Sequence, residues 1–277
     1  MHPLTLGYSP CPNDTFIFYA LVHGLVESDG CQFSERLEDV ETLNGLALQG
    51  ELDVSKVSYH ALGYLRDEYC LLRAGGALGR GCGPLVVSRN HADMVDLRGK
   101  RIAVPGRYTT ACLLLRLFDP TLTELVILPF HEIMAAVAQG EVDAGVIIHE
   151  SRFTYPDYGL KSLLDLGEWW ERESGQPIPL GGIVARRSLG AGRVAAIDRA
   201  LRASVEYALA HRAEAAAYIR AHSQEMSNEV CAAHIDLYVN RYSVDLGAEG
   251  EAAVTALLGR AEAAALIPSS AKHLFRP

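Results

Sequence analysis

The chain has 277 residues, and its 25 Lys and Arg against 34 Asp and Glu give a formal charge of −9. With 49% hydrophobic and 21% charged residues, the composition is that of a globular protein and excludes a disordered, collagen-like or coiled-coil chain. The acidic balance argues against a nucleic-acid partner and against a polybasic membrane surface. No apolar run approaches the roughly 20 residues of a membrane helix, so no membrane partner is expected either.

Cysteine usage and the first residues predict a cellular compartment. The opening MHPLTLGYSP lacks a basic segment and a long apolar segment, so no secretory signal is expected. Six cysteines are scattered without a CxxC pair: Cys11, Cys31, Cys70, Cys82, Cys112 and Cys231. In a long chain without a signal, this usage is typical of reduced thiols and predicts a cytoplasmic protein.

The first part of the chain alternates strand and helix patterns. The alternation predicts a strand over 4–9, a turn over 9–14, helices over 15–24 and 40–50, a strand over 51–58 and a third helix from Tyr59. Asn13 or Asp14 is the expected N-cap of the first helix, and Gly24 its end. Strand–helix alternation is the signature of an α/β architecture, and the length predicts roughly two domains.

The same pattern returns later in the chain. Residues 99–118 predict a strand, a turn and a helix, and QGELDVSKVSYH at 49–60 is matched by QGEVDAGVIIHE at 139–150, an offset of 90 residues. In both segments a helix ends at Gly and a buried strand follows. Two matching units in the same order predict a duplicated α/β lobe.

Ligands of open α/β sheets lie outside the carboxyl ends of the strands. If two lobes face each other, four such ends line one cleft: 9–15, 56–60, 105–111 and 149–152. Helix N-termini among these ends favour an anion, because their first backbone N–H groups have no partner within the helix.

The last third of the chain is Ala-rich and helical. Its pattern predicts a long helix over 191–222, broken near His211, and further helices near 227–239 and 247–265 that pack against the first lobe. The segment PLGGIVARRS at 179–188 resembles GPLVVSR at 83–89, and we expect the two as paired hinge strands between the lobes.

Several motifs are missing. The chain has no Walker A motif, no GxSxG elbow and no HExxH, and GRGCG at 79–83 lacks the last glycine of GxGxxG and precedes a strand. The absence of these motifs argues against nucleotide, flavin, nicotinamide and zinc chemistry. No metal site is expected.

His149 is the candidate base. It follows the apolar strand AGVII, and imidazole titrates near pH 6.5, so a neutral base is available at neutral pH. The alternative is a polar residue that closes a strand. Glu150 either orients this histidine or points into solvent, with solvent slightly favoured.

Other candidates are groups that hold an anion or a flat ring. One of Thr109 and Thr110 is expected to cap a helix while the other, with backbone N–H groups, holds a carboxylate. Lys56 and Ser58 end the equivalent strand of the first lobe. The candidate cations are Lys56, Arg107 and Arg152, and the candidate stacking rings, for which core packing is the favoured role, are Tyr8, Phe153, Tyr155 and Trp169.

Five blocks of sequence resemble one known family. They are SPCPNDTFIFYALVHG at 9–24, EDVETLN at 38–44, GGALGRGCGPLVV at 75–87, AVPGRYTTA at 103–111 and IIHESRFTYPDYGL at 147–160. These blocks closely resemble the 1,4-dihydroxy-6-naphthoate synthase family of the futalosine route to menaquinone, from about residue 4 to the C-terminus.

The resemblance implies a fold and a reaction. The fold is α/β and two-lobed, like type 2 periplasmic binding proteins, with a mixed sheet flanked by helices in each lobe: 1–88 plus 185–277 form the first lobe and 89–184 the second, with a cleft between them. The reaction converts an anionic small molecule, cyclic dehypoxanthine futalosine, to 1,4-dihydroxy-6-naphthoate, by a lyase with no metal or organic cofactor. The family's base falls on His149, and its substrate contacts fall on Lys56, Val57, Ser58, Thr110 and Ala111.

Other functions share this fold. A solute-binding protein for transport, a chorismate dehydratase and a pyrimidine-precursor enzyme are the alternatives, and fold alone does not choose among them. The sequence leaves open the oligomeric state, the order of bond breaking and the extent of lobe closure. Cys11 is expected to be a buried small residue rather than a nucleophile.

Overall fold

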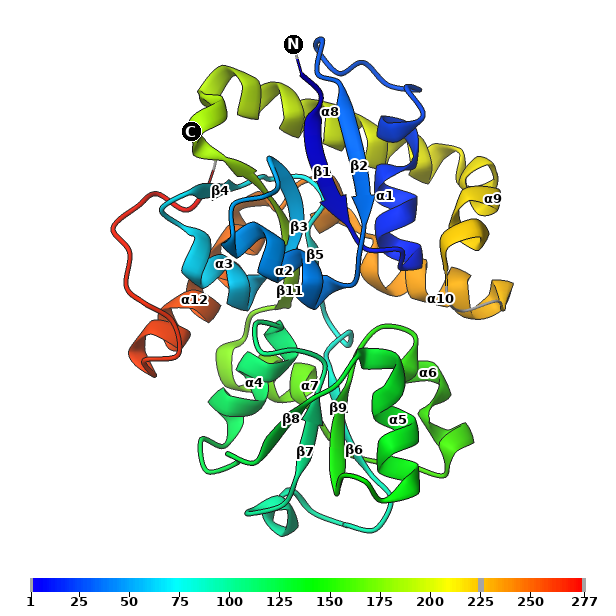
Figure 1. The fold of residues 1–277 in the computed structure, drawn as a ribbon, viewed down its shortest axis with the longest axis vertical. Helices are drawn as coiled ribbons and strands as arrows, with labels where there is room; N and C mark the ends of the chain where they lie inside the picture. Colours follow the sequence, from blue (N-terminus) through cyan, green and yellow to red (C-terminus); the bar gives the residue numbers. More distant parts are fainter. Residues whose placement is uncertain (1, 224–226, 276–277) are drawn as a thin grey trace.

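The computed structural model describes residues 2–223 and 227–275. These residues form two lobes, each built on an open sheet with helices packed against it (Figure 1). Residues 1, 276 and 277, at the ends of the expected first lobe, lie outside the described part. None of the helices in the described ranges is long and apolar enough to cross a membrane.

The first lobe is built on a sheet with strand order β2–β1–β3–β11–β4, and β5 also pairs with β11. Strand β1 is parallel to β2 and β3, whereas β11 is antiparallel to β3, β4 and β5. The strands are β1 Leu4–Tyr8, β2 Phe33–Leu37, β3 Val54–Ser58, β4 Tyr69–Leu71, β5 Ala77–Gly79 and β11 Ile178–Arg186.

The second lobe is built on a sheet with strand order β10–β6–β9–β7–β8. Strand β7 is parallel to β8 and β9, and β6 is antiparallel to β9 and β10. The strands are β6 Leu85–Ser88, β7 Ile102–Val104, β8 Leu125–Ile127, β9 Ala144–Ile147 and β10 Lys161–Asp165.

The two sheets repeat one topology. In each, a central strand lies between two parallel neighbours, and an antiparallel strand follows: β2–β1–β3–β11 in the first lobe and β8–β7–β9–β6 in the second. The segments 49–60 and 139–150 both span a helix end and the next strand, which confirms the predicted duplication. The repeated helices are α1 Pro12–Val22 and α2 Val40–Leu48, and α4 Thr110–Phe118 and α5 Phe130–Gln139.

The expected start of the first helix was wrong. Helix α1 begins at Pro12 with Cys11 as N-cap, so Asn13 and Asp14 lie inside its first turn. Proline suits the first helical position, because its φ is already helical and that position needs no N–H donor. The Asp14 carboxylate instead accepts hydrogen bonds from Ser9, at 2.7 Å from its hydroxyl.

The expected pairing of 83–89 with 179–188 was also wrong. Strand β6 pairs with β9 and β10 in the second sheet, and β11 pairs with β3, β4 and β5 in the first. The two segments look alike because each is the antiparallel neighbour of a repeated strand. We propose that the lobe boundaries follow the two sheets, so that β6 belongs to the second lobe and all of β11 to the first. The chain then crosses from the first lobe to the second between 79 and 85, and returns between 174 and 178.

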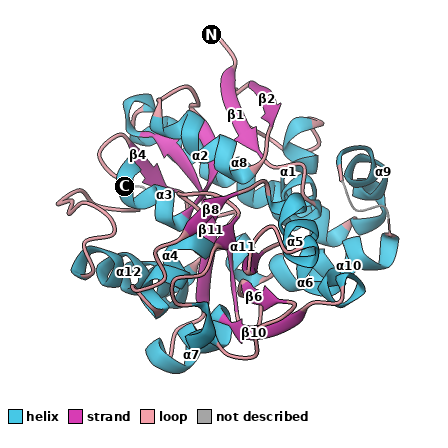
Figure 2. Ribbon diagram, turned by 60° about the horizontal axis from the view of Figure 1, so that its bottom comes forward, coloured by secondary structure: helices cyan, strands magenta, loops and turns pink. Residues whose placement is uncertain are grey.

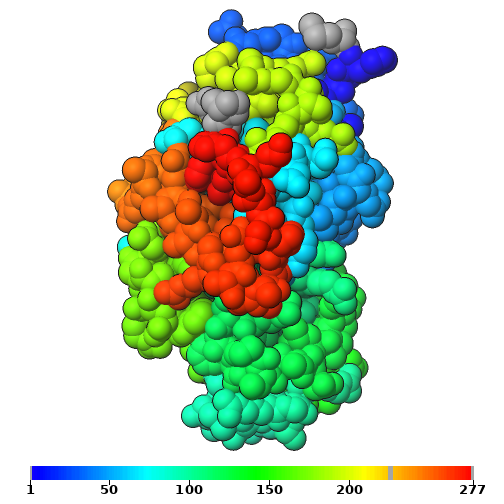
Figure 3. Space-filling view, turned by 90° about the vertical axis from the view of Figure 1, so that its left-hand side faces the viewer, coloured from blue at the N-terminus to red at the C-terminus, as the bar shows by residue number. Residues whose placement is uncertain are grey.

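The C-terminal helices cover the first lobe. Helices α8, α9 and α10 pack on α1, and the break between α8 and α9 falls at His211 as predicted. Helix α12 contacts β11 and α3, and it reaches α4 of the second lobe; Figure 3 shows this C-terminal part lying over the junction of the lobes. The helices are α8 Ala191–Ala210, α9 Arg212–His222, α10 Asn228–Tyr238, α11 Arg241–Val244 and α12 Gly247–Ala263.

Helices surround the strands of both sheets (Figure 2). Short helices complete the fold. They are α3 Tyr59–Leu65, α6 Ser151–Thr154 and α7 Leu166–Ser174, with 3₁₀ turns at Met94–Leu97, Tyr155–Tyr158 and Arg187–Leu189. One apolar core joins the lobes, since Leu71 and Val184 of the first sheet belong to the same buried cluster as Ile102 and Val146 of the second. The strand ends between the lobes are therefore held by packing on both sides.

Candidate active site between the lobes

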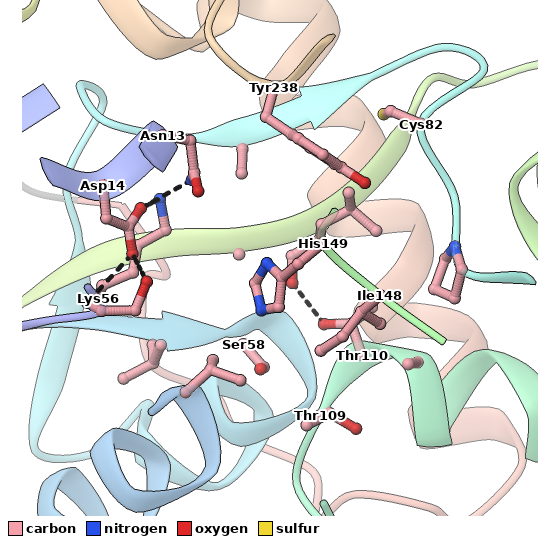
Figure 4. Close-up of a pocket in the computed structure, with 18 residues that line it drawn as sticks. Asn13, Asp14, Lys56, Ser58, Cys82, Thr109, Thr110, Ile148, His149 and Tyr238 are labelled. Atoms are coloured by element: carbon pink, nitrogen blue, oxygen red, sulfur yellow. Dashed lines mark hydrogen bonds and ion pairs between the residues drawn. The ribbon is translucent and has the colours of Figure 1, made fainter. Parts of the chain in front are cut away.

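All four strand ends that the sequence singled out line one pocket. The pocket holds about 660 Å³, part of it open to solvent, which suits a small molecule. Its lining includes Lys56, Val57, Ser58, Thr110, Ala111 and His149. Figure 4 shows the imidazole of His149 projecting into this pocket, with the Asp14–Lys56 pair on one side and Thr109 and Thr110 on the other.

His149 follows β9 directly and adopts a left-handed backbone with φ of 56°. A non-glycine residue in this region is uncommon and costs energy, and such strain gathers at functional sites. The ring packs edge-on against Phe130, with centroids 5.0 Å apart, and lies nearly parallel to the ring of His234. The turn thus directs the imidazole into the pocket.

Burial sets the charge of His149. Desolvation lowers its pKa below the ordinary value of 6.5, although the carboxylates of Glu150 and Asp14 act in the opposite direction. The imidazole is therefore neutral at neutral pH. A neutral imidazole accepts a proton, as a general base must.

Lys56 is buried and paired within the protein. Its Nζ lies 3.0 Å from Oδ1 of Asp14 and donates to the carbonyl of Gly75 at 3.0 Å. The Asp14 carboxylate also accepts from Nδ2 of Asn13 at 2.9 Å. Lys56 therefore lines the pocket, but its charge is offset by Asp14.

The other two candidate cations lie elsewhere. Arg107 is exposed and lines a separate hollow beside Tyr108 and Arg116. Arg152 pairs with Asp165 at 2.7 Å and donates to the carbonyl of Gly83. The sequence could not show this, because each arginine follows a strand end that does reach the pocket.

Donors for an anion come from the start of α4 and from β3. Thr109 caps α4, because its hydroxyl accepts from the N–H of Cys112. The N–H groups of Thr110 and Ala111, at the first two helical positions, have no acceptor within the helix. The hydroxyl of Ser58 accepts from Asn44 and keeps its own proton to donate.

Thr110 also joins the lobes. Its hydroxyl donates to the carbonyl of Leu180, in β11, at 2.6 Å. The neighbouring carbonyl of Thr109 lies 3.2 Å from Nδ1 of His60, in α3. Both carboxylate oxygens of Glu41, in α2, accept from the N–H of Tyr108 at 3.1 Å. These contacts hold the start of α4 against the first lobe.

The candidate stacking rings do not line the pocket. Tyr8 is buried and stacks on Phe18, and Trp169 packs edge-on against Phe118. Tyr155 packs on the core of the second lobe, whereas Phe153 is 39% exposed, so the packing role favoured for Phe153 was wrong.

Glu150 does not point into solvent as expected. Its side chain is 13% exposed, and its Oε2 lies 3.9 Å from Nδ1 of His234. Sequence reasoning also missed His234 and Tyr238, both in α10, because that helix carries no recognisable motif. Helix α10 packs on α1 and on β5, and this packing brings the two side chains beside His149.

Two thiols lie near the site, and both are protonated. Cys82 lines the pocket, and burial raises the pKa of its thiol to about 12. Burial raises the pKa of Cys11 well above its ordinary value, in line with the buried role expected for it. Neither thiol is a nucleophile in this setting. Among the described residues, no cluster of three or more His, Cys, Asp and Glu side chains is arranged to hold a metal ion.

Solved structures place the fold. The chain matches a crystal structure of an Archaeoglobus fulgidus protein with TM-score 0.90 and 41% identity, over 96% of this chain and 99% of that one. It matches the alkanesulfonate-binding protein of Xanthomonas axonopodis pv. citri with TM-score 0.70 and 17% identity, over 96% and 94% of the chains. The fold is therefore that of the periplasmic binding proteins.

Sequence comparisons place the family. A family model described as menaquinone biosynthesis matches residues 4–263. The 1,4-dihydroxy-6-naphthoate synthase of Thermus thermophilus is 56% identical, over 99% of this chain and all of that protein. The enzyme of the same name from Streptomyces coelicolor is 51% identical, over 96% of this chain and 95% of that protein. The chain belongs to the 1,4-dihydroxy-6-naphthoate synthase family of menaquinone biosynthesis.

Proposed function

We propose that this protein is a cytoplasmic lyase that converts cyclic dehypoxanthine futalosine to 1,4-dihydroxy-6-naphthoate, with His149 as general base and no metal or organic cofactor. The observation that carries the proposal is a neutral imidazole, its pKa lowered by burial, that projects into a pocket of about 660 Å³ between the lobes. Membership of a family named for 1,4-dihydroxy-6-naphthoate supports the product, and the substrate is part of the proposal.

The pocket offers complementary roles for the substrate. The N–H groups of Thr110 and Ala111 and the hydroxyl of Ser58 bind the substrate carboxylate at the positive end of α4. Val57 supplies an apolar wall. Lys56 is the further substrate contact in this proposal, since it lines the same pocket while Asp14 holds its Nζ at 3.0 Å.

The reaction begins with proton transfer. A ring nitrogen of His149 takes a proton from a substrate carbon, and the electron pair left behind starts elimination and ring opening. The sugar-derived fragment departs, and formation of the aromatic naphthalene makes the sequence favourable. The closed lobes exclude water and hold the reacting atoms in contact.

Mass spectrometry of the purified protein with cyclic dehypoxanthine futalosine tests this proposal. We expect dihydroxynaphthoate from the wild type and a loss of turnover of about 10²-fold or more in His149→Ala, which matches the usual contribution of a general base. The matched control is His131→Ala, since His131 is half-exposed in the same lobe and also precedes a glutamate.

The outcomes separate the alternatives. Product from His149→Ala at the wild-type rate would move the base to another residue. Unaltered substrate recovered from the wild-type protein would favour a solute-binding function, which this fold also serves.

A further inference from the structure

His234 lies directly behind His149 and is entirely buried. It belongs to α10, its side chain has 0% exposure, and its ring lies 5.9 Å from that of His149, at an angle of 21°. The role proposed for His149 does not use it. A fully buried histidine beside a base needs an explanation, because burying a polar ring is costly unless its nitrogens are paired.

The hydrogen bonds around His234 assign its proton. Asp14 is ion-paired with Lys56 and accepts Nδ2 of Asn13, so the amide oxygen of Asn13 is left facing His234. That oxygen lies 2.9 Å from Nε2 of His234 and accepts its proton. A neutral imidazole carries one ring proton, so Nδ1 of His234 is a bare acceptor.

This acceptor faces another acceptor. Nδ1 of His234 lies 3.9 Å from Oε2 of Glu150, and among the described residues neither atom has a hydrogen-bond partner. Two acceptors at this distance form no hydrogen bond. One proton placed between them would satisfy both atoms.

His149 connects this pair with the substrate pocket. His149 and Glu150, together with Phe130, line a second cavity of about 420 Å³. His149 also lines the substrate pocket. His149 therefore connects the pocket, where the substrate releases a proton, with the Glu150–His234 pair, which lacks one.

We propose that Glu150 and His234 form a proton-holding pair that receives the substrate proton from His149. The N–H bond on His149 breaks, an O–H bond forms on Oε2 of Glu150, and that proton is shared in a hydrogen bond with Nδ1 of His234. His149 is then neutral while the ring opens, so it does not return the proton to carbon. When the sugar-derived fragment leaves, the proton passes back through His149 to the departing oxygen. This inference rests on the proposed function.

The surrounding charges are consistent with a Glu150–His234 pair that holds no shared proton in the resting protein. Burial holds the pKa of His234 well below its ordinary value, so the ring is neutral. Burial raises the pKa of both Cys11 and Tyr238, which face Glu150 as neutral groups. The charged groups that act on His149 are Glu150, Asp14 and its partner Lys56, and Asp39.

The substitution Glu150→Gln tests the pair. Gln keeps the size of the side chain and donates an N–H to Nδ1 of His234, but it takes up no proton. We expect kcat to fall about 10-fold to 100-fold with KM within about twofold. The acid limb of kcat/KM moves to lower pH, because the Glu150 carboxylate raises the pKa of His149. This shift reports the loss of the carboxylate charge. The fall in kcat above pH 6.5, where His149 is neutral in both proteins, reports the loss of the proton acceptor.

The matched control is Glu132→Gln. Glu132 also follows a histidine, with Oε1 3.8 Å from Nε2 of His131, but both side chains are about half exposed. We expect it to behave as the wild type. A Glu150→Gln protein that folds and matches this control in kcat and in pH profile would overturn the proton-holding pair.

Two further measurements keep the inference testable. Ring ¹⁵N NMR of the resting wild type is expected to show His234 with a proton on Nε2 alone, and a doubly protonated His234 at neutral pH would overturn the proposal even if Glu150→Gln fails to fold. His149→Ala tests the two proposals separately. A fully active His149→Ala would move the base to another residue and leave the pair without its proton donor. An inactive His149→Ala with an unaffected Glu150→Gln would overturn only the pair.

Discussion

The imidazole of His149 lies between the ring of Phe130 and the ring of His234, and its backbone is left-handed. Its chemistry follows from these neighbours. Burial favours the neutral ring, the Glu150 carboxylate partly offsets that effect, and the Asp14–Lys56 pair adds little net charge. At the residue scale, this environment keeps the imidazole neutral at neutral pH, as the proposed role of base requires.

The acid limb of the wild-type pH profile is the prediction at this scale. Because burial lowers the pKa of His149, kcat/KM is expected to stay constant down to below about pH 6.5 and then to fall about tenfold per pH unit as the ring takes up a proton. Steady-state kinetics between pH 4.5 and 8 measure it. A midpoint above pH 6.5 would contradict the assignment.

The first turn of α4 is the element on which the proposed anion site depends. Thr109 caps it by accepting the N–H of Cys112 and donating to the carbonyl of Gly106 at 2.8 Å. Thr110 and Ala111 follow the cap and line the pocket, their N–H groups have no acceptor within the helix, and the helix dipole favours a carboxylate there. The element therefore combines a helix cap with the donors that the proposed carboxylate site requires.

Thr109→Ala is the prediction at the element scale. Loss of the cap is expected to lower the free energy of unfolding by about 1 kcal/mol and to raise KM several-fold, since the turn that presents the donors loosens. Urea denaturation and steady-state kinetics measure the two effects. Thr255→Ala, an exposed threonine in α12, is the control and should change stability by less than about 0.5 kcal/mol. Equal behaviour of the two variants would remove the capping argument.

The whole molecule is two repeated lobes joined by one core and by contacts at the start of α4. His60 sits at this joint, fully buried, with Nδ1 3.2 Å from the carbonyl of Thr109. Burial lowers its pKa from 6.5 to about 4. Between about pH 4 and pH 6.5, His60 therefore takes up a proton in the unfolded chain but not in the folded protein.

This difference predicts how stability depends on pH. Between about pH 6.5 and pH 4 the unfolded chain binds a proton at His60 and the folded protein does not, so stability is complete above this window and falls as pH falls, by about 3 kcal/mol from this residue. Urea denaturation at pH 7.5 and 4.5 is expected to show a smaller loss in His60→Gln than in the wild type. Replacement of half-exposed His131 is the control, and an equal loss in all three proteins would contradict the prediction.

Local patterns were enough for much of this protein. The strand–helix order, the repeat at an offset of 90 residues and the break at His211 are encoded in hydrophobic periodicity and in glycine positions, so they can be read without a structure. The four strand ends that line the pocket followed from the same patterns, because strand ends of a repeated α/β unit meet at one edge.

Only the tertiary structure decided what lies behind those ends. The expected pairing of 83–89 with 179–188 was wrong because the two segments lie in different sheets. Their similar sequences did not show this, since the tertiary packing determines which strands lie side by side. The partly buried position of Glu150, the offset charge of Lys56 and the approach of His234 from α10 arise from contacts between residues 84, 42 and 221 positions apart in the chain. Such contacts leave no local pattern, because burial and electrostatic pairing depend on which elements pack together.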